Sequence, residues 1–105
     1  MAFTITITTE AEKQLRSLPV REQRIVEAAV LSRLQYQPAT QTRAIKRLRP
    51  NPLAEFELRV GNFRVLYNVE ASDVVLLLIG RKVGNKLIVA GEEFHGYQHN
   101  STESP

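Results

Sequence analysis

The chain has 105 residues, of which 43% are hydrophobic and 24% are charged, and it carries a formal net charge of +3. This length and composition predict one water-soluble globular domain, and no segment approaches the ~18 apolar residues of a membrane span. The absence of cysteine excludes disulfides, zinc–thiolate sites and thiol nucleophiles. The first residues lack the basic start and apolar run of a signal peptide, so we expect a cytoplasmic protein with no membrane partner.

Positive charge is concentrated in the middle of the sequence. Residues 1–42 contain five basic and four acidic side chains, residues 43–86 contain nine and four, and residues 87–105 contain none and three. Such an asymmetry attracts a polyanion, either a phosphate backbone or an acidic protein segment.

The start of the chain predicts a strand followed by a short helix. Apolar residues alternate with threonine over Phe3–Thr8, which is typical of a strand with one buried face. Thr8 or Thr9 can cap the helix, and Thr9 places Glu12 at the capping-box position. The helix should end near Ser17, because a Leu-Pro pair follows.

A second helix is predicted from Pro19 to the Gln37-Pro38 pair. Apolar residues recur in it at intervals of three and four, which predicts a buried stripe. The members of this stripe are Ile25, Ala28, Ala29, Leu31 or Ser32, and Tyr36.

A basic segment follows the second helix. It contains Arg43, Lys46, Arg47 and Arg49, with apolar residues three apart between them. This spacing predicts a short turn that lies on the core with its cations outward, where they can contact phosphate.

The next segment predicts a β-hairpin with two arginines facing each other. Alternation from Phe56 to Val60 predicts a strand, Gly61-Asn62 a two-residue loop, and Phe63 the start of the returning strand, in which we expect Tyr67 to pack in the core. Arg59 then pairs with Arg64, a like-charge pair that costs roughly 0.2–1 kcal/mol in a sheet. A bound polyanion would remove this cost.

The remaining residues predict a central strand and a short final one. Val74–Ile79 is an unbroken apolar run, typical of a strand covered on both faces, and a Gly-Asn turn leads into Lys86–Ala90. We expect a domain over residues 1–94 and a disordered tail over 95–105. The whole pattern predicts an α+β fold: a strand, two helices, then three to four mainly antiparallel strands, with the helices on one face and the other face free for binding.

The order of these elements resembles the RelE/ParE superfamily of type II toxin–antitoxin toxins. The segments that carry the resemblance are KRLRPNP, FELRVGNFRVLYNVE and an apolar strand that ends in GRK. It covers about residues 3–90, is strongest over Lys46–Glu70, and favours the RelE branch because the first helix is short. It implies a cognate antitoxin as partner and, for RelE, cleavage of messenger RNA on the ribosome; for ParE, it implies poisoning of DNA gyrase.

The resemblance also implies site residues, and RNA cleavage of this kind uses neither a metal nor a cofactor. The ribose hydroxyl is the nucleophile, and guanidinium groups stabilise the phosphorane because they bind phosphate oxygens and stay charged. Arg64 matches the family's arginine after the hairpin turn, Arg59 a basic position before it, and Arg81 or Lys82 the basic residue after the apolar strand. Arg43, Lys46, Arg47 and Arg49 are the expected RNA contacts.

Proton-transfer groups depart from the family pattern. Glu55 and Glu57 stand where relatives carry lysines, and Ile88 stands where they carry a tyrosine. Glu57 is either a base or only an ion-pair partner of the arginines, and His95 or Tyr97 would be an acid if the tail folds back. The alternatives to an endoribonuclease are therefore a ParE-like toxin that binds gyrase and a degenerate toxin that acts as an antitoxin-binding co-repressor.

Overall fold

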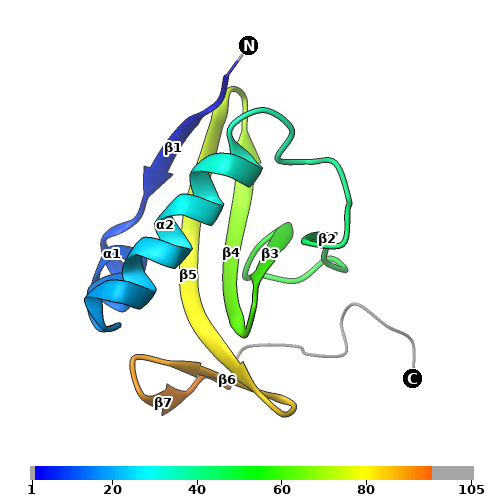
Figure 1. The fold of residues 1–105 in the computed structure, drawn as a ribbon. Coiled ribbons are helices and arrows are strands. Elements are labelled where there is room, and N and C mark those ends of the chain that lie inside the picture. The colour runs from blue at the N-terminus through cyan, green and yellow to red at the C-terminus, as the bar shows by residue number, and fades with distance from the viewer. Residues whose placement is uncertain (1, 96–105) are drawn as a thin grey trace.

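The computed structural model describes residues 2–95, which form two helices and a seven-stranded sheet (Figure 1). The elements in chain order are β1 (Thr4–Ile7), α1 (Thr9–Arg16), α2 (Val20–Leu34), β2 (Ile45–Arg47), β3 (Phe56–Val60), β4 (Phe63–Glu70), β5 (Asp73–Val83), β6 (Lys86–Val89) and β7 (Glu92–Glu93). The predicted α+β class is confirmed, with two short strands, β2 and β7, beyond those predicted.

Strand β5 is the centre of the sheet. The strands run in the order β2-β3-β4-β5-β6-β7 with antiparallel neighbours, and β1 pairs with β5 in parallel. The long β5 pairs with β4 along most of its length, whereas β1 pairs with its first half and β6 with its end (Figure 1). This arrangement confirms the central strand that the apolar run predicted.

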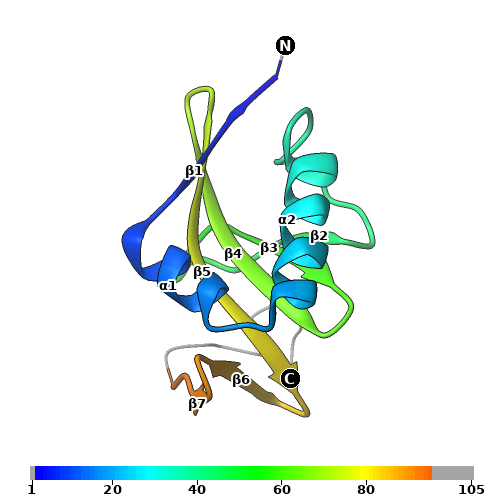
Figure 2. The same ribbon diagram turned by 60° about the vertical axis from the view of Figure 1, so that its left-hand side comes forward.

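Both helices cover the same face of the sheet (Figure 2). They bury one main core, to which α1 contributes Ala11 and Leu15 and α2 contributes Val26, Val30 and Leu34. The sheet adds Ile45, Phe56, Leu58, Val65, Tyr67, Val74, Leu76 and Ile79. Tyr67 is fully buried, stacks on Phe56 with the ring centroids 5.4 Å apart, and donates a hydrogen bond to the Pro38 carbonyl at 2.6 Å, so its predicted core position is confirmed.

The N-cap of α1 is Thr8, not Thr9. The Thr8 hydroxyl oxygen accepts a hydrogen bond from Ala11 N at 3.2 Å and donates one to the Leu76 carbonyl at 3.0 Å. The structure thus has the first of the two predicted candidates, and the capping box that Thr9 would make with Glu12 does not form. Thr8 is also tied to β5, which fixes the point where the chain leaves β1. The predicted end of α1 is confirmed, with Ser17 as C-cap.

The predicted buried stripe of α2 was also wrong. Its buried residues are Val26, Val30 and Leu34, whereas Ile25, Leu31 and Tyr36 are 45%, 53% and 63% exposed. Apolar residues surround much of this helix, so its periodicity does not define one face. Packing against the sheet selects the face that is buried.

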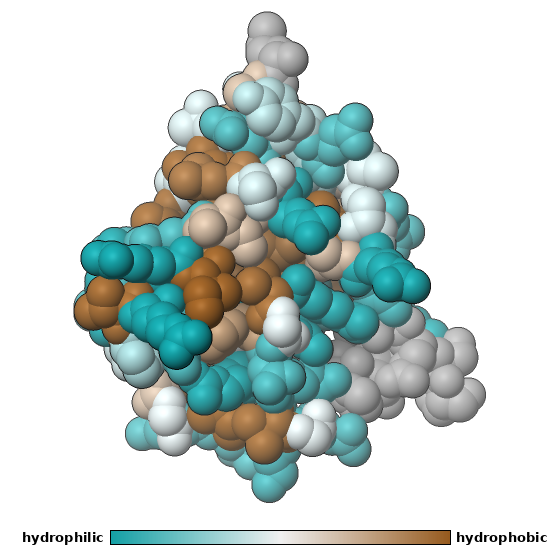
Figure 3. Space-filling model, viewed as in Figure 1, coloured by the Kyte–Doolittle hydropathy of each residue, from teal (hydrophilic) through white to brown (hydrophobic). Residues whose placement is uncertain are grey.

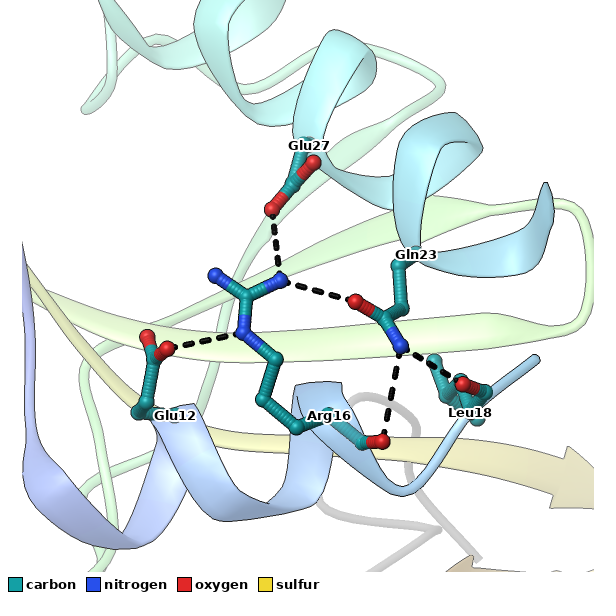
Figure 4. Close-up of polar contacts among 5 residues, drawn as sticks. All are labelled: Glu12, Arg16, Leu18, Gln23 and Glu27. Carbon is teal, nitrogen blue, oxygen red and sulfur yellow. Dashed lines mark hydrogen bonds and ion pairs between the residues drawn. The ribbon is translucent and has the colours of Figure 1, made fainter. Parts of the chain in front are cut away.

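One arginine links the two helices (Figure 4). Arg16 Nε donates to Glu12 at 2.8 Å within α1, and its Nη1 donates to Gln23 at 2.8 Å and to Glu27 at 3.1 Å on α2. Gln23 Nε2 in turn donates to the Leu18 carbonyl at 2.7 Å. Hydrogen bonds to the two carboxylates raise the pKa of Arg16 above its ordinary value. No helix among residues 2–95 has the length and apolar character needed to cross a membrane.

Candidate functional site

The hairpin predicted from the sequence is confirmed in its register. Val60 pairs with Phe63 across the Gly61-Asn62 loop, and Arg59 pairs with Arg64. Gly61 has a φ of +57°, the conformation that the first position of a type II′ turn requires. The two arginines therefore lie directly opposite each other, on the sheet face away from the helices, because their strand neighbours Leu58 and Val65 point into the main core.

This second face is only partly open. A smaller apolar cluster of Leu48, Ala54, Leu66, Leu78 and Leu87 lies on it, and Leu53, Leu77, Val89 and Phe94 pack against the cluster. The expectation of a wholly free face was therefore wrong, since the chain between β2 and β3 folds over part of it. The arginine pair lies beside this cluster, near the hairpin turn.

Glu57 is buried on the same face. Its side chain is 0% exposed, and its Oε1 accepts a hydrogen bond from Arg59 Nε at 3.1 Å. Burying a carboxylate costs several kcal/mol unless cations and donors surround it. The ion pair expected from the sequence is present, and it brings a carboxylate next to the arginine pair.

Arg64 is held at the turn by the backbone. Its Nη1 donates to the carbonyls of Gly61 at 2.8 Å and Phe63 at 2.9 Å. Its Nε is buried and has no hydrogen-bond partner within the part of the chain that the structure describes. These contacts fix the position of the guanidinium group.

Two lysines lie on the same face of the sheet as Glu57 and the arginine pair. Lys46 pairs with Glu57 across β2 and β3, and Lys82 pairs with Leu87, a member of the second-face cluster. Lys82 N also donates to the Asn62 carbonyl at 2.7 Å, which brings the end of β5 to the hairpin turn. We call Lys46, Glu57, Arg59, Arg64 and Lys82 the basic face.

Arg81 and Ile88 lie on the opposite side of the sheet. They pair with each other across β5 and β6. Arg81 Nη2 donates to Glu22 of α2 at 2.6 Å, and its guanidinium lies 5.1 Å from the Phe63 ring centroid. Of the two candidates after the apolar strand, the structure therefore brings Lys82, and not Arg81, to the basic face.

Gly80 is the reason that β5 and β6 can approach so closely at this point. A Cβ atom there would lie 2.8 Å from the Ile88 carbonyl oxygen and 2.9 Å from a Val89 methyl group. Gly80 also pairs with Arg64 in the sheet. A side chain at this position would displace the strand that carries Lys82.

The basic segment contains a strand that the sequence did not predict. Ile45 and Lys46 lie in β2, where a turn was expected, because three residues with one apolar side chain are too short a pattern to recognise. Arg47 lies over the Phe56 ring at 5.0 Å. Arg43 and Arg49 are exposed on either side of β2, so only Lys46 of these four faces Glu57.

Glu55 and Asn68 extend the β3–β4 ladder by side-chain contacts, which sequence reasoning missed. Glu55 N donates to Asn68 Oδ1 at 2.7 Å, and Val69 N donates to Glu55 Oε1 at 3.1 Å. His95 is exposed at the end of the described residues, and Tyr97 and the rest of the predicted tail lie outside them.

Comparison with known proteins gives matches to solved structures. No protein-family model and no curated protein matches the chain. The chain is similar to a chain of the RelBE2 toxin–antitoxin complex from Mycobacterium tuberculosis, with a TM-score of 0.68 and 28% identity over 78% of this chain and all of that one. It is also similar to a chain of the archaeal RelE–RelB complex from Pyrococcus horikoshii, with a TM-score of 0.60 and 22% identity over 77% and 96% of the two chains.

The fold thus defines a small RelE-like α+β protein, and the resemblance seen in the sequence is confirmed. The chain is a structural relative of RelE toxins, as found in complexes with RelB antitoxins.

Proposed function

We propose that this protein is the toxin of a type II toxin–antitoxin system and that it cuts messenger RNA at the ribosome without a metal. The observation that carries the proposal is the Arg59–Arg64 pair, held directly across a ladder beside a buried carboxylate. A sheet selected only for stability would avoid two facing arginines. A phosphate between them turns this unfavourable pair into a binding site.

Four members of the basic face, all but Lys46, have a role in this reaction. The ribose 2′-hydroxyl gives its proton to water as its oxygen attacks the adjacent phosphorus, and the buried Glu57 positions Arg59 through their ion pair. Arg59 and Arg64 neutralise the phosphorane, and Arg64 does so without reorganisation because the turn already holds it. Lys82 gives a proton to the leaving 5′-oxygen as the P–O bond breaks, so the products are a 2′,3′-cyclic phosphate and a 5′-hydroxyl.

The proposed protein partner is an antitoxin with an acidic, amphipathic segment. Both solved relatives were crystallised as toxin–antitoxin or RelE–RelB complexes. On this chain, a groove of about 310 Å³ lies between α1, α2 and β1 and is lined by Ile5, Ile7, Leu15, Val30 and Leu31, among others. Apolar surface is visible on this side of the molecule (Figure 3), which suits a partner that folds on binding.

Primer extension on a defined messenger RNA in a reconstituted translation reaction tests the nuclease. We expect cuts positioned by the codon in the ribosomal A site, and we expect Arg64→Ala to reduce them by 100-fold or more, on the order of the loss of one oxyanion-hole donor. Arg24→Ala is the control, because Arg24 is exposed on α2, on the other side of the sheet.

Intact messenger RNA with wild-type protein would contradict the nuclease proposal. If growth arrest then persists in Arg64→Ala, the target is a protein such as gyrase, as in the ParE branch. If wild-type protein causes no arrest, the chain is an antitoxin-binding co-repressor. In either case, burial and the ion pair with Arg59 would give Glu57 a structural role only.

A further inference from the structure

A second cavity lies on the molecule beside the basic face. It has a volume of about 300 Å³ and is formed by the segment between β2 and β3 together with β4. Its lining includes Arg49, Asn51, Leu53, Ala54, Glu55 and Asn68. Its walls combine the planar polar groups of Glu55 and Asn68 with Arg49 and with the apolar Leu53 and Ala54. This combination suits a small planar ring that carries polar atoms on one edge.

The wall of this cavity is rigid. Asn51 Oδ1 accepts hydrogen bonds from Leu53 N at 2.8 Å and Ala54 N at 3.2 Å, and its Nδ2 donates to the Arg49 carbonyl at 2.6 Å and the Ala54 carbonyl at 3.2 Å. Prolines on both sides of Asn51 restrict the backbone further. The loop therefore keeps the cavity open without a ligand.

Glu55 and Asn68 each use only part of their side chain in the fold. Glu55 Oε1 accepts from Val69 N, and Asn68 Oδ1 accepts from Glu55 N. Among residues 2–95, no hydrogen bond of Glu55 Oε2 or of Asn68 Nδ2 is found. The cavity therefore presents an acceptor next to a donor, which matches the edge of a nucleobase, where donors and acceptors alternate.

The cavity also lies at a suitable position relative to the arginine pair. Asn68 follows Arg64 by four residues on β4, so the two lie on the same face, roughly 13 Å apart along the strand. A single RNA strand with one phosphate at Arg59 and Arg64 can thus reach the cavity with a base a short distance along the chain. Unstacked bases of single-stranded RNA are the ones that proteins read through their hydrogen-bonding edges.

We propose that this cavity binds one nucleobase of the RNA, and that Glu55 and Asn68 read its hydrogen-bonding edge and so set the sequence preference of cleavage. The inference rests on the proposed nuclease function. It also gives Glu55, which departs from the lysine pattern of the family, a role in specificity.

Two isosteric variants test this proposal. Glu55→Gln keeps an oxygen for Val69 N but adds a donor, and Asn68→Asp keeps the oxygen for Glu55 N but loses a donor, so both preserve the fold. Cleavage ends are sequenced on a pool of messenger RNAs, and base frequencies are normalised to the total number of cuts. We expect a preference at one fixed position from the cut, changed by on the order of tenfold in each variant. Glu70→Gln, an exposed change at the end of β4, is the control and should keep the wild-type profile.

An unchanged profile in both variants would overturn the base pocket while leaving the nuclease intact. If wild-type protein does not cut RNA at all, the nuclease proposal fails, and binding of labelled A, C, G and U octanucleotides by fluorescence anisotropy tests the pocket separately. A change in the order of affinities in Glu55→Gln supports the pocket, and the same order in both proteins refutes it.

Discussion

At the scale of single residues, Tyr67 shows how one polar group is accommodated in the core. Its ring is fully buried, and its hydroxyl donates to the Pro38 carbonyl at 2.6 Å, in the loop between α2 and β2. We expect Tyr67→Phe to lower the free energy of unfolding by about 1–3 kcal/mol, because the buried carbonyl loses its donor. Urea denaturation measures this, and Tyr36→Phe, at a 63% exposed position, should be neutral.

Burial of Tyr67 should also make the free energy of unfolding fall at alkaline pH. Burial raises the pKa of the Tyr67 hydroxyl above its ordinary value of about 10. Below pH 10 the folded and unfolded chains bind this proton equally, so its contribution to stability is complete; above pH 10 the unfolded chain loses it first, and stability falls as pH rises. Tyr67→Phe should therefore show a shallower decline between pH 10 and 11 than wild type. Equal slopes would contradict the assignment.

The partners of a residue can be predicted from the sequence where local rules set them, and less well where contacts between distant segments set them. The facing arginines follow from a two-residue loop, so their pairing could be predicted without a structure. The N-cap could be narrowed only to Thr8 or Thr9, because the bond of Thr8 to Leu76 joins residues far apart in the chain. Asn68 was missed for the same reason: its role depends on Glu55 of the neighbouring strand.

At the scale of elements, the end of β5 presents two neighbouring cations to opposite sides of the sheet. Arg81 connects β5 to α2 through Glu22, whereas Lys82 lies on the basic face. We expect Arg81→Ala to lower the free energy of unfolding by about 0.5–2 kcal/mol, from the ion pair and the contact with Phe63, with little effect on RNA binding. Lys82→Ala should leave unfolding nearly unchanged but weaken RNA binding.

Salt dependence separates these two variants. If Lys82 contacts a phosphate, the slope of log K against log salt concentration for single-stranded RNA should become less steep by about 0.7 in Lys82→Ala and stay the same in Arg81→Ala. Fluorescence anisotropy at several salt concentrations gives the slopes. The opposite result would place Arg81, the other candidate predicted from the sequence, in the site.

The elements themselves differ in how well the sequence defines them. Alternation defines β1, β3 and, apart from Leu66, β4, and an apolar run defines β5. The face of α2 remains undefined, because apolar residues occupy successive positions from Ile25 to Leu31 apart from Glu27. Strand β2 exists only through its pairing with β3, so Lys46 was expected on a turn and not opposite Glu57.

At the scale of the whole molecule, charge and apolar surface are divided between two sides. The basic face lies on one side of the sheet, and the helices with the groove of Leu15, Val30 and Leu31 lie on the other. Arg21, Arg24 and Arg33 are exposed on α2, while Glu22 and Glu27 are already paired with arginines of this chain. An acidic partner segment can therefore bind the helical side.

We expect the double change Ile25→Asp and Leu31→Asp to weaken antitoxin binding by tenfold or more while the fold is retained, because both side chains are exposed. Isothermal titration with the protein encoded by the neighbouring gene measures the affinity, and circular dichroism checks the fold. Val83→Asp, an exposed change on β5, is the control. Unchanged affinity in the double variant would place the antitoxin elsewhere.

The parallel pairing of β1 with β5 has a consequence for the synthesis of the protein. Thr4 pairs with Asp73, and Thr8 bonds to Leu76, so β1 has its partner in a strand that is synthesised much later. Such long-range contacts form only after both segments are available. The nascent chain therefore cannot close its core, or place Lys82 beside Arg64, until β5 has emerged. Any activity that needs Lys82 beside Arg64 can therefore arise only after β5 has been synthesised.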